Sequence, residues 1–134
     1  MKPTEDLVIH KPPLIYFKLK KQFKVNWDNG IIITYFPHIY YKWNLNDAKY
    51  VHESVHLRQQ SEMGVELWWD KYCADPQFRL SQEVEAYKAE VEFIRTTVSD
   101  TRERFKMIRE IAKELAGPIY GHIIKVEDAI QLFA

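Results

Sequence analysis

The sequence predicts an α+β fold in which a small antiparallel sheet from residues 1–43 packs on three to four helices. Apolar and polar residues alternate in several places before Trp43, as they do in strands, and Asn29-Gly30 favours a hairpin turn. From Asn46 onward, apolar residues recur instead at the three- and four-residue spacing of an α-helix. The length of 134 residues indicates a single domain, residues 1–134.

The strands are expected in the first third of the chain. Leu14–Lys20 and Gln22–Trp27 are predicted as the first two, because their side chains alternate between two faces. After the Asn-Gly turn, Ile31–Phe36 is predicted to return as the next strand. Pro37 interrupts the pairing because it has no backbone N–H, so Ile39–Trp43 is predicted to continue as a short edge segment.

Helical segments are expected over the rest of the chain, and residues typical of helix ends bound them. The expected features are a helix from Asn46 to Tyr72, a restart at Asp75-Pro76, a long helix capped by Ser81, a helix from Asp100 or Thr101 to Gly117-Pro118, and a short helix over Val126–Phe133. Trp68-Trp69 is predicted to fill the core near the end of the first helix, and Phe105 is predicted to point inward.

The charges are balanced, with 19 Lys and Arg residues against 19 Asp and Glu residues. This balance gives no electrostatic basis for nucleic acid or an anionic membrane as the main partner, and the basic run at Lys18, Lys20 and Lys21 is interpreted as the solvent face of a strand. No apolar run approaches the roughly 20 residues that span a bilayer, and no apolar segment follows Met1. The sequence therefore predicts a cytoplasmic protein without a signal peptide.

The stretch His52-Glu53-Ser54-Val55-His56 is the most informative part of the chain. Two histidines four residues apart lie one turn apart on the same face of a helix, where both imidazoles can bind one Zn²⁺. Glu53 follows the first histidine and is predicted to lie beside the metal, where a general base can take a proton from water. The alternative interpretation is a pair of solvated or core-edge histidines that binds nothing.

A catalytic zinc site usually has a third protein ligand, and the next helix offers several carboxylates. At about 100° per residue, Glu83 lies about 60° from the centre of the apolar stripe of that helix. Glu90 lies about 80° from the centre, whereas Glu85 lies about 140° away on the solvent side. Glu83 is therefore the expected third ligand, with Glu90 second and Glu85 as the remaining alternative.

This pair of motifs, His52-Glu53-x-x-His56 and then Glu83-x-Glu85-Ala86-Tyr87, resembles the gluzincin zinc metallopeptidases, and the small minigluzincins resemble the chain in size and element order. The resemblance implies a zincin-like fold, with Zn²⁺ bound by the two histidines and Glu83 and with Glu53 as general base. Many gluzincins carry an Asp where this chain has Tyr87, and that Asp orients a zinc-binding histidine.

Hydrolysis also needs a donor that stabilises the oxyanion. His122, in the turn after the last long helix, is assigned this catalytic role because a His or Tyr beyond the third ligand can play it in gluzincins. The other candidates are Tyr120, Tyr87 and Arg58.

The predicted function is a zinc-dependent peptidase that acts on a peptide or protein substrate. Ile31–Phe36 or Ile39–Trp43 would be the edge strand that binds the substrate backbone by strand addition. A regulatory protease with one cellular target is a narrower version of this prediction. The alternative is a non-catalytic, zinc-containing subunit of a larger assembly such as a virus particle.

Overall fold

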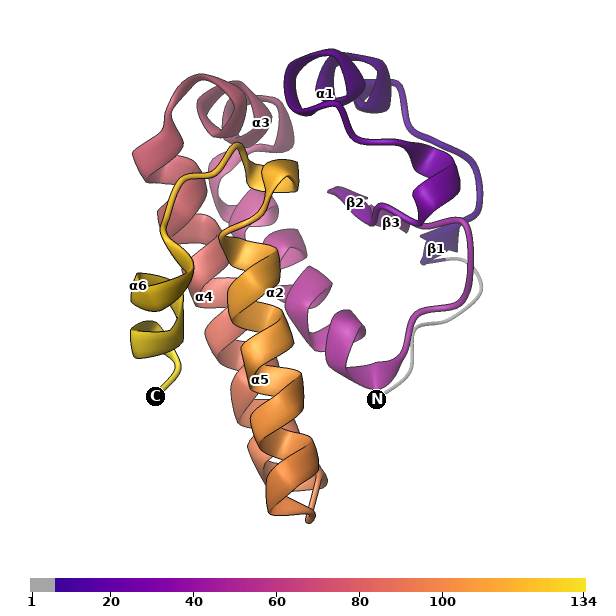
Figure 1. Ribbon diagram of the computed structural model, residues 1–134. Coiled ribbons are helices and arrows are strands. Elements are labelled where there is room, and N and C mark those ends of the chain that lie inside the picture. Colours follow the sequence, from indigo (N-terminus) through magenta and orange to yellow (C-terminus); the bar gives the residue numbers. More distant parts are fainter. Residues whose placement is uncertain (1–6) are drawn as a thin grey trace.

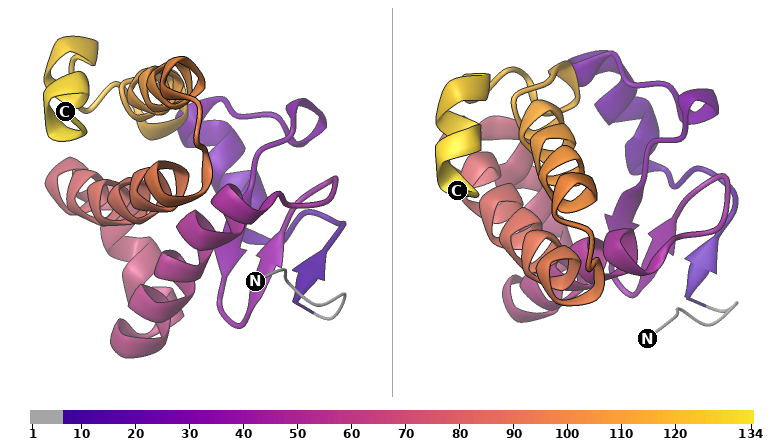
Figure 2. Two further views of the ribbon diagram at one scale, coloured as in Figure 1. Left: turned by 90° about the horizontal axis from the view of Figure 1, so that it is seen from below. Right: turned by 60° about the horizontal axis from the view of Figure 1, so that its bottom comes forward.

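The computed structural model describes residues 7–134, which form an α+β arrangement of six α-helices and a three-stranded mixed sheet (Figure 1). Helices α4 (Pro76–Thr97) and α5 (Thr101–Leu115) form a long pair, and α6 (Val126–Leu132) lies beside it. Helix α2 (Asp47–Met63) lies between this pair and the sheet, as the views in Figure 2 also show. The α+β class is confirmed.

The sheet has the strand order β1-β3-β2, where β1 is Val8–Ile9, β2 is Ile33–Tyr35 and β3 is His38–Tyr40. Strand β3 runs parallel to β1 and antiparallel to β2, so the prediction of an antiparallel sheet is wrong for one of its two pairings. The expectation that Ile39–Trp43 is an edge segment is also wrong, because β3 pairs on both sides. Strand β2 is an edge strand, and its hairpin to β3 passes through Phe36-Pro37.

The predicted strands Leu14–Lys20 and Gln22–Trp27 are wrong, because helix α1 (Ile15–Phe23) occupies most of this segment. Its buried residues recur at helical spacing, and they are Tyr16, Leu19 and Phe23. The segment as a whole also shows a partial alternation, with Ile15, Phe17 and Leu19 on one side, which is why a short amphipathic helix was mistaken for a strand. The expected hairpin at Asn29-Gly30 is a 3₁₀ turn, Trp27–Asn29, which Gly30 ends with a positive φ of 84°.

Helices α2 and α4 begin at the capping residues that the sequence predicted. The Asn46 side chain accepts a hydrogen bond from the Lys49 N–H at 2.8 Å and caps α2 as predicted. The segment up to Tyr72 is two helices, since the chain breaks at Gly64 (φ 98°) before α3 (Val65–Ala74). Asp75 caps α4, which confirms the restart.

Two predictions on the later helices are wrong. Ser81 lies inside α4, where its hydroxyl donates to the Phe78 carbonyl at 2.7 Å, so it caps no helix. Phe105 on α5 is 64% exposed and points outward. The start of α5 after its N-cap Asp100 agrees with the prediction.

Two apolar clusters form the core. One lies between α1, the sheet and α3 and contains Trp68 and Trp69, which are buried as predicted. The other lies between α4, α5 and α6 and contains Ile94 and Leu115. None of the helices within residues 7–134 is both long and apolar enough to cross a membrane.

Candidate metal centre

The buried face of α2 is polar rather than apolar. Its buried residues are His52, Glu53, His56, Gln59 and Gln60. Its apolar residues Val51 and Val55 are only half-buried. Because an unpaired buried polar group is costly, each of these side chains needs a partner from another element or from α2 itself.

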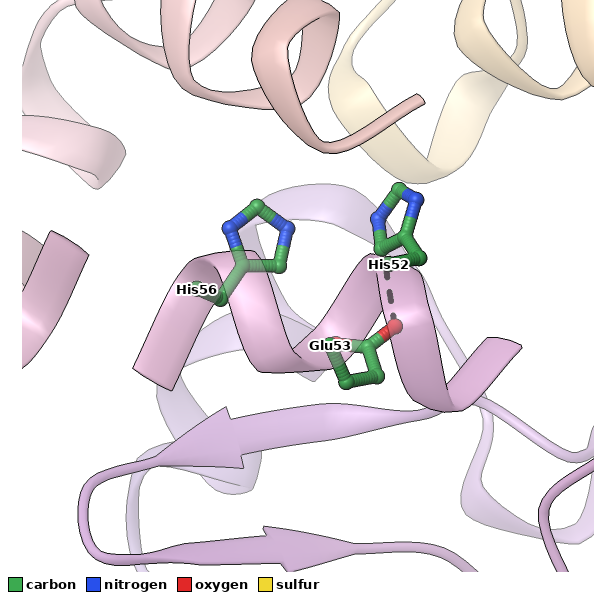
Figure 3. A group of neighbouring side chains, drawn as sticks. All are labelled: His52, Glu53 and His56. Atoms are coloured by element: carbon green, nitrogen blue, oxygen red, sulfur yellow. Dashed lines mark ion pairs between the residues drawn. The ribbon is translucent and has the colours of Figure 1, made fainter. Parts of the chain in front are cut away.

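The two imidazoles converge on one carboxylate oxygen of α4. The Nε2 atoms of His52 and His56 each lie 3.1 Å from Oε1 of Glu83, and all three side chains are buried. Figure 3 shows the two rings one turn apart on the same side of α2, with Glu53 on the side of the strands. The structure therefore brings together the residues expected as metal ligands, across the interface of α2 and α4.

The other ring nitrogens face acceptor oxygens. Nδ1 of His56 lies 2.8 Å from Oε1 of Gln59, whose amide nitrogen donates to Glu85 at 2.8 Å. Nδ1 of His52 lies 3.1 Å from Oε1 of Glu90, and neither atom has a hydrogen-bond partner among residues 7–134, so this contact is a close ion pair without hydrogen-bond angles. Acceptors at Nδ1 favour the tautomer that leaves Nε2 available to a metal.

A hydroxyl holds the other oxygen of Glu83. Tyr72 of α3 donates to Glu83 Oε2 at 2.6 Å, so Oε1 is the oxygen that faces the imidazoles. The competing carboxylates lie elsewhere: Glu85 is half-exposed and pairs with Arg58, and Glu90 faces the opposite side of the His52 ring. Among the three candidates, only Glu83 meets both Nε2 atoms.

Glu53 lies between the histidines and the sheet. Its Oε1 accepts a hydrogen bond from the Thr34 hydroxyl of β2 at 2.9 Å, while its Oε2 lies 3.8 Å from Nε2 of His52. Burial raises the pKa of Glu53 above its ordinary value, and the nearby charges of His52 and His56 offset only part of that rise. The carboxylate is thus held beside the histidines and takes up a proton more readily than one in water.

The charges of His52 and Glu83 stabilise each other. Burial opposes the charged form of His52, but Glu53, Glu83 and Glu90 outweigh it and raise the pKa of His52 to about 10. Burial also opposes the carboxylate form of Glu83, yet the two imidazoles hold the pKa of Glu83 far below its usual range. Without a metal, a proton on His52 balances the carboxylates around it.

The donor set suits a metal ion. Ligand atoms of His52, Glu53 and His56 all lie within 4.8 Å of one another, and Glu83 adds an oxygen at the same place. Two imidazole nitrogens and one or two carboxylate oxygens are a combination that binds Zn²⁺ and other divalent transition metals. This buried group could therefore hold a metal ion.

A cavity of about 560 Å³ adjoins the group. Its lining includes His52, Glu53, His56 and Glu83. It also includes Tyr120 and residues 30–34, of which the last two belong to the edge strand β2. The site therefore has space for a ligand beside the candidate metal-binding atoms.

The expected oxyanion donors fall in different places. His122 is exposed, its Nδ1 lies 3.2 Å from the Ala116 carbonyl, and it is not part of the cavity lining. Arg58 is exposed and forms ion pairs with Glu62 and Glu85. Tyr87 and Tyr120 both line the cavity, with their hydroxyls 2.6 Å apart.

Tyr120 is well suited to donate. Burial, followed by the charge of Glu83, raises the pKa of Tyr120 well above its ordinary value, which keeps the hydroxyl protonated. Tyr87 packs its ring against His52 with centroids 4.3 Å apart. Tyr87 thus supports the imidazole by contact.

Sequence reasoning missed Thr34, Gln59 and Tyr72, which contact Glu53, His56 and Glu83 respectively. Glu90 was expected only as the second candidate for the third ligand, whereas it faces Nδ1 of His52. Gln59 carried a signal, because it lies three residues after His56 on the same helix face. Thr34 and Tyr72 come from other elements, so no spacing in the sequence points to them.

Comparisons of the chain with protein-family models, with curated protein sequences and with solved structures found no match to any of them.

Proposed function

We propose that this chain is a zinc-dependent peptidase. The observation that carries the proposal is the convergence of both Nε2 atoms on Oε1 of Glu83, beside a cavity that Glu53 also lines. A catalytic zinc site needs three protein ligands and an open position, and the two imidazoles, the Glu83 carboxylate and the adjoining cavity support this assignment.

Zinc would be held by His52, His56 and Glu83. When bound, zinc supplies a Lewis acid that polarises a carbonyl and makes water more acidic. The protein orients its own ligands: Gln59 and Glu90 face Nδ1 of His56 and His52, and Tyr72 bonds Glu83.

Glu53 acts as the general base. Its carboxylate takes a proton from the attacking water and later gives that proton to the leaving amine nitrogen. The hydrogen bond from Thr34 fixes one oxygen, and the raised pKa of Glu53 suits a group that both accepts and returns a proton. Tyr120, rather than His122, is the proposed donor to the oxyanion, because it lines the same cavity.

The peptide backbone would bind along β2, the edge strand. Part of this strand is already occupied: the Thr34 carbonyl accepts from Gln60 and Trp69, and the Phe36 N–H donates to Gln60 at 2.7 Å. The open stretch is therefore Ile33, the first residue of β2, with residues 31–32 before it, and all three line the cavity.

Cleavage of a peptide library by the zinc-loaded protein, read by mass spectrometry, tests the proposal. We expect wild type to cleave and Glu53→Gln to lose most turnover while it keeps one zinc per chain. Glu85→Gln is the matched control, because Glu85 is half-exposed and meets neither Nε2 atom. A library left intact by zinc-loaded wild type would contradict the peptidase proposal.

One observation favours a second candidate, a closed structural zinc site in a subunit of a larger assembly. Glu53 groups with both histidines within 4.8 Å and so could serve as a fourth ligand. In that case Glu53→Gln would lose zinc, and a hydroxamate would not raise the melting temperature of the zinc-loaded protein. An open site predicts a shift that grows as hydroxamate exceeds its dissociation constant.

A further inference from the structure

Helix α1 exposes two large apolar side chains on its outer face. Leu14, the residue before its first turn, is 90% exposed, and Phe17 is 63% exposed. The opposite face buries Tyr16, Leu19 and Phe23, so the core already has its apolar contacts. Leu14 and Phe17 therefore contribute little to the fold.

Lysines surround this apolar pair. The exposed lysines on and beside α1 are Lys11, Lys18, Lys20, Lys21 and Lys24. None of them forms an ion pair within the described residues, and no Asp or Glu occurs between positions 7 and 27. The charges of Lys18 and of Asp70 on α3 both act on the Cys73 thiol, so one acidic residue lies in the same region. We call these five lysines with Leu14 and Phe17 the α1 patch.

The placement of these lysines differs from the prediction. A solvent-facing strand would have spread them along a sheet, whereas a helix gathers them within a few turns of Leu14 and Phe17. Helix α1 lies at one end of the molecule (Figure 1). The net charge of zero over the whole chain conceals this local excess. Long-range attraction depends on the local excess within about one Debye length, roughly 8–10 Å.

We propose that the α1 patch docks on an anionic lipid surface. Exposed apolar side chains flanked by lysines combine the two attractions that hold a helix in a bilayer interface. Of the seven residues in the patch, only Lys24 lines either of the two cavities found within residues 7–134, and it does so at the site described above. A bound peptide would need a groove, whereas a lipid surface accommodates a convex helix.

Docking would also place the cavity near the lipid. The inner side of α1 contributes Leu19 and Phe23 to the cavity wall, so α1 separates the cavity from the proposed docking face. If the chain is the peptidase proposed above, its substrates would be polypeptides at a membrane surface. The docking itself does not depend on peptidase activity.

Co-sedimentation with vesicles tests the proposal. We expect the protein to pellet with vesicles of phosphatidylcholine and phosphatidylserine, to remain soluble with phosphatidylcholine alone, and to be released by salt. The double variant Lys18→Glu/Lys21→Glu should weaken binding at least about tenfold, and Leu14→Ser/Phe17→Ser should weaken it as well.

The matched control is Phe105→Ser/Lys106→Glu on α5, where a 64% exposed phenylalanine adjoins an exposed lysine among mixed charges. This control should bind like wild type, and circular dichroism should show that all variants fold. Three outcomes would overturn the proposal: no binding to anionic vesicles, equal loss in the control, or binding of the α1 patch to RNA or poly-glutamate without binding to vesicles.

Discussion

Nδ1 of His52 and Oε1 of Glu90 lie 3.1 Å apart in the buried interface between α2 and α4. The other oxygen of Glu90, Oε2, forms an ion pair with Nζ of Lys49 on α2 at 3.2 Å, and this ion pair restrains the position of the carboxylate. Glu90 thus lies where a carboxylate can orient the His52 imidazole. It is seven residues, or about two helical turns, beyond Glu83 on α4. Tyr87 occupies the intervening turn and packs on the same imidazole.

Glu90→Gln should weaken zinc binding by about 10- to 100-fold, because such partners fix the orientation and basicity of a metal-binding imidazole. Titration against a chromophoric zinc chelator measures the change. Glu92→Gln is the control, since Glu92 is exposed on the same helix and should leave affinity unaltered. Equal affinity of Glu90→Gln and wild type would show that Glu90 has no orienting role.

Glu83 could be predicted to face the histidine helix, because the buried residues of α4 recur at helical spacing along its 22 residues. The polar partners were harder to foresee. A buried helix face of histidine, glutamate and glutamine has no apolar periodicity, so nothing in α2 itself marks Gln60 as buried.

The N-terminal third shows a different limit. Ile15–Phe23 has apolar residues that satisfy both a helical and an alternating pattern, and only its packing against α3 and the sheet decides between them. The sheet order could not be foreseen either, because β1 is two residues long and pairs with β3 across about 30 residues of chain.

The charge on His52 predicts a pH dependence of the metal-free protein. The folded pKa of about 10 exceeds the ordinary value of 6.5, so the stabilisation is complete below about pH 6.5 and is lost as the pH rises toward 10. With a chelator present, the urea midpoint should therefore fall between about pH 7 and pH 9.

Zinc must displace the proton from His52, so its affinity should rise with pH by about tenfold per unit for each proton displaced. Competition titrations at two pH values below 10 measure this slope. An affinity that does not change with pH would mean that His52 is neutral in the metal-free protein, contrary to its raised pKa.

Gly30 and Gly64 both have positive φ, at 84° and 98°, but only Gly30 faces a neighbour. A Cβ at Gly30 would collide with the ring of Trp43, whereas a Cβ at Gly64 would meet nothing within 4 Å. We expect Gly64→Ala to cost about 1 kcal/mol of unfolding free energy and Gly30→Ala about 2–3 kcal/mol.

Urea denaturation measures both changes. Trp43→Ala should remove most of the extra cost of Gly30→Ala, because it removes the collision and leaves only the backbone strain. If the two glycine variants lose the same stability, the loop at residues 27–32 is free to move away from Trp43.

The metal content of the purified, zinc-loaded protein tests the central claim most directly. Mass spectrometry of wild type and Glu85→Ala should find about one zinc per chain, while His52→Ala, His56→Ala and Glu83→Ala should each retain almost none, because each removes a proposed ligand. Wild type without zinc, or zinc that survives in Glu83→Ala and is lost in Glu85→Ala, would contradict the proposed zinc site.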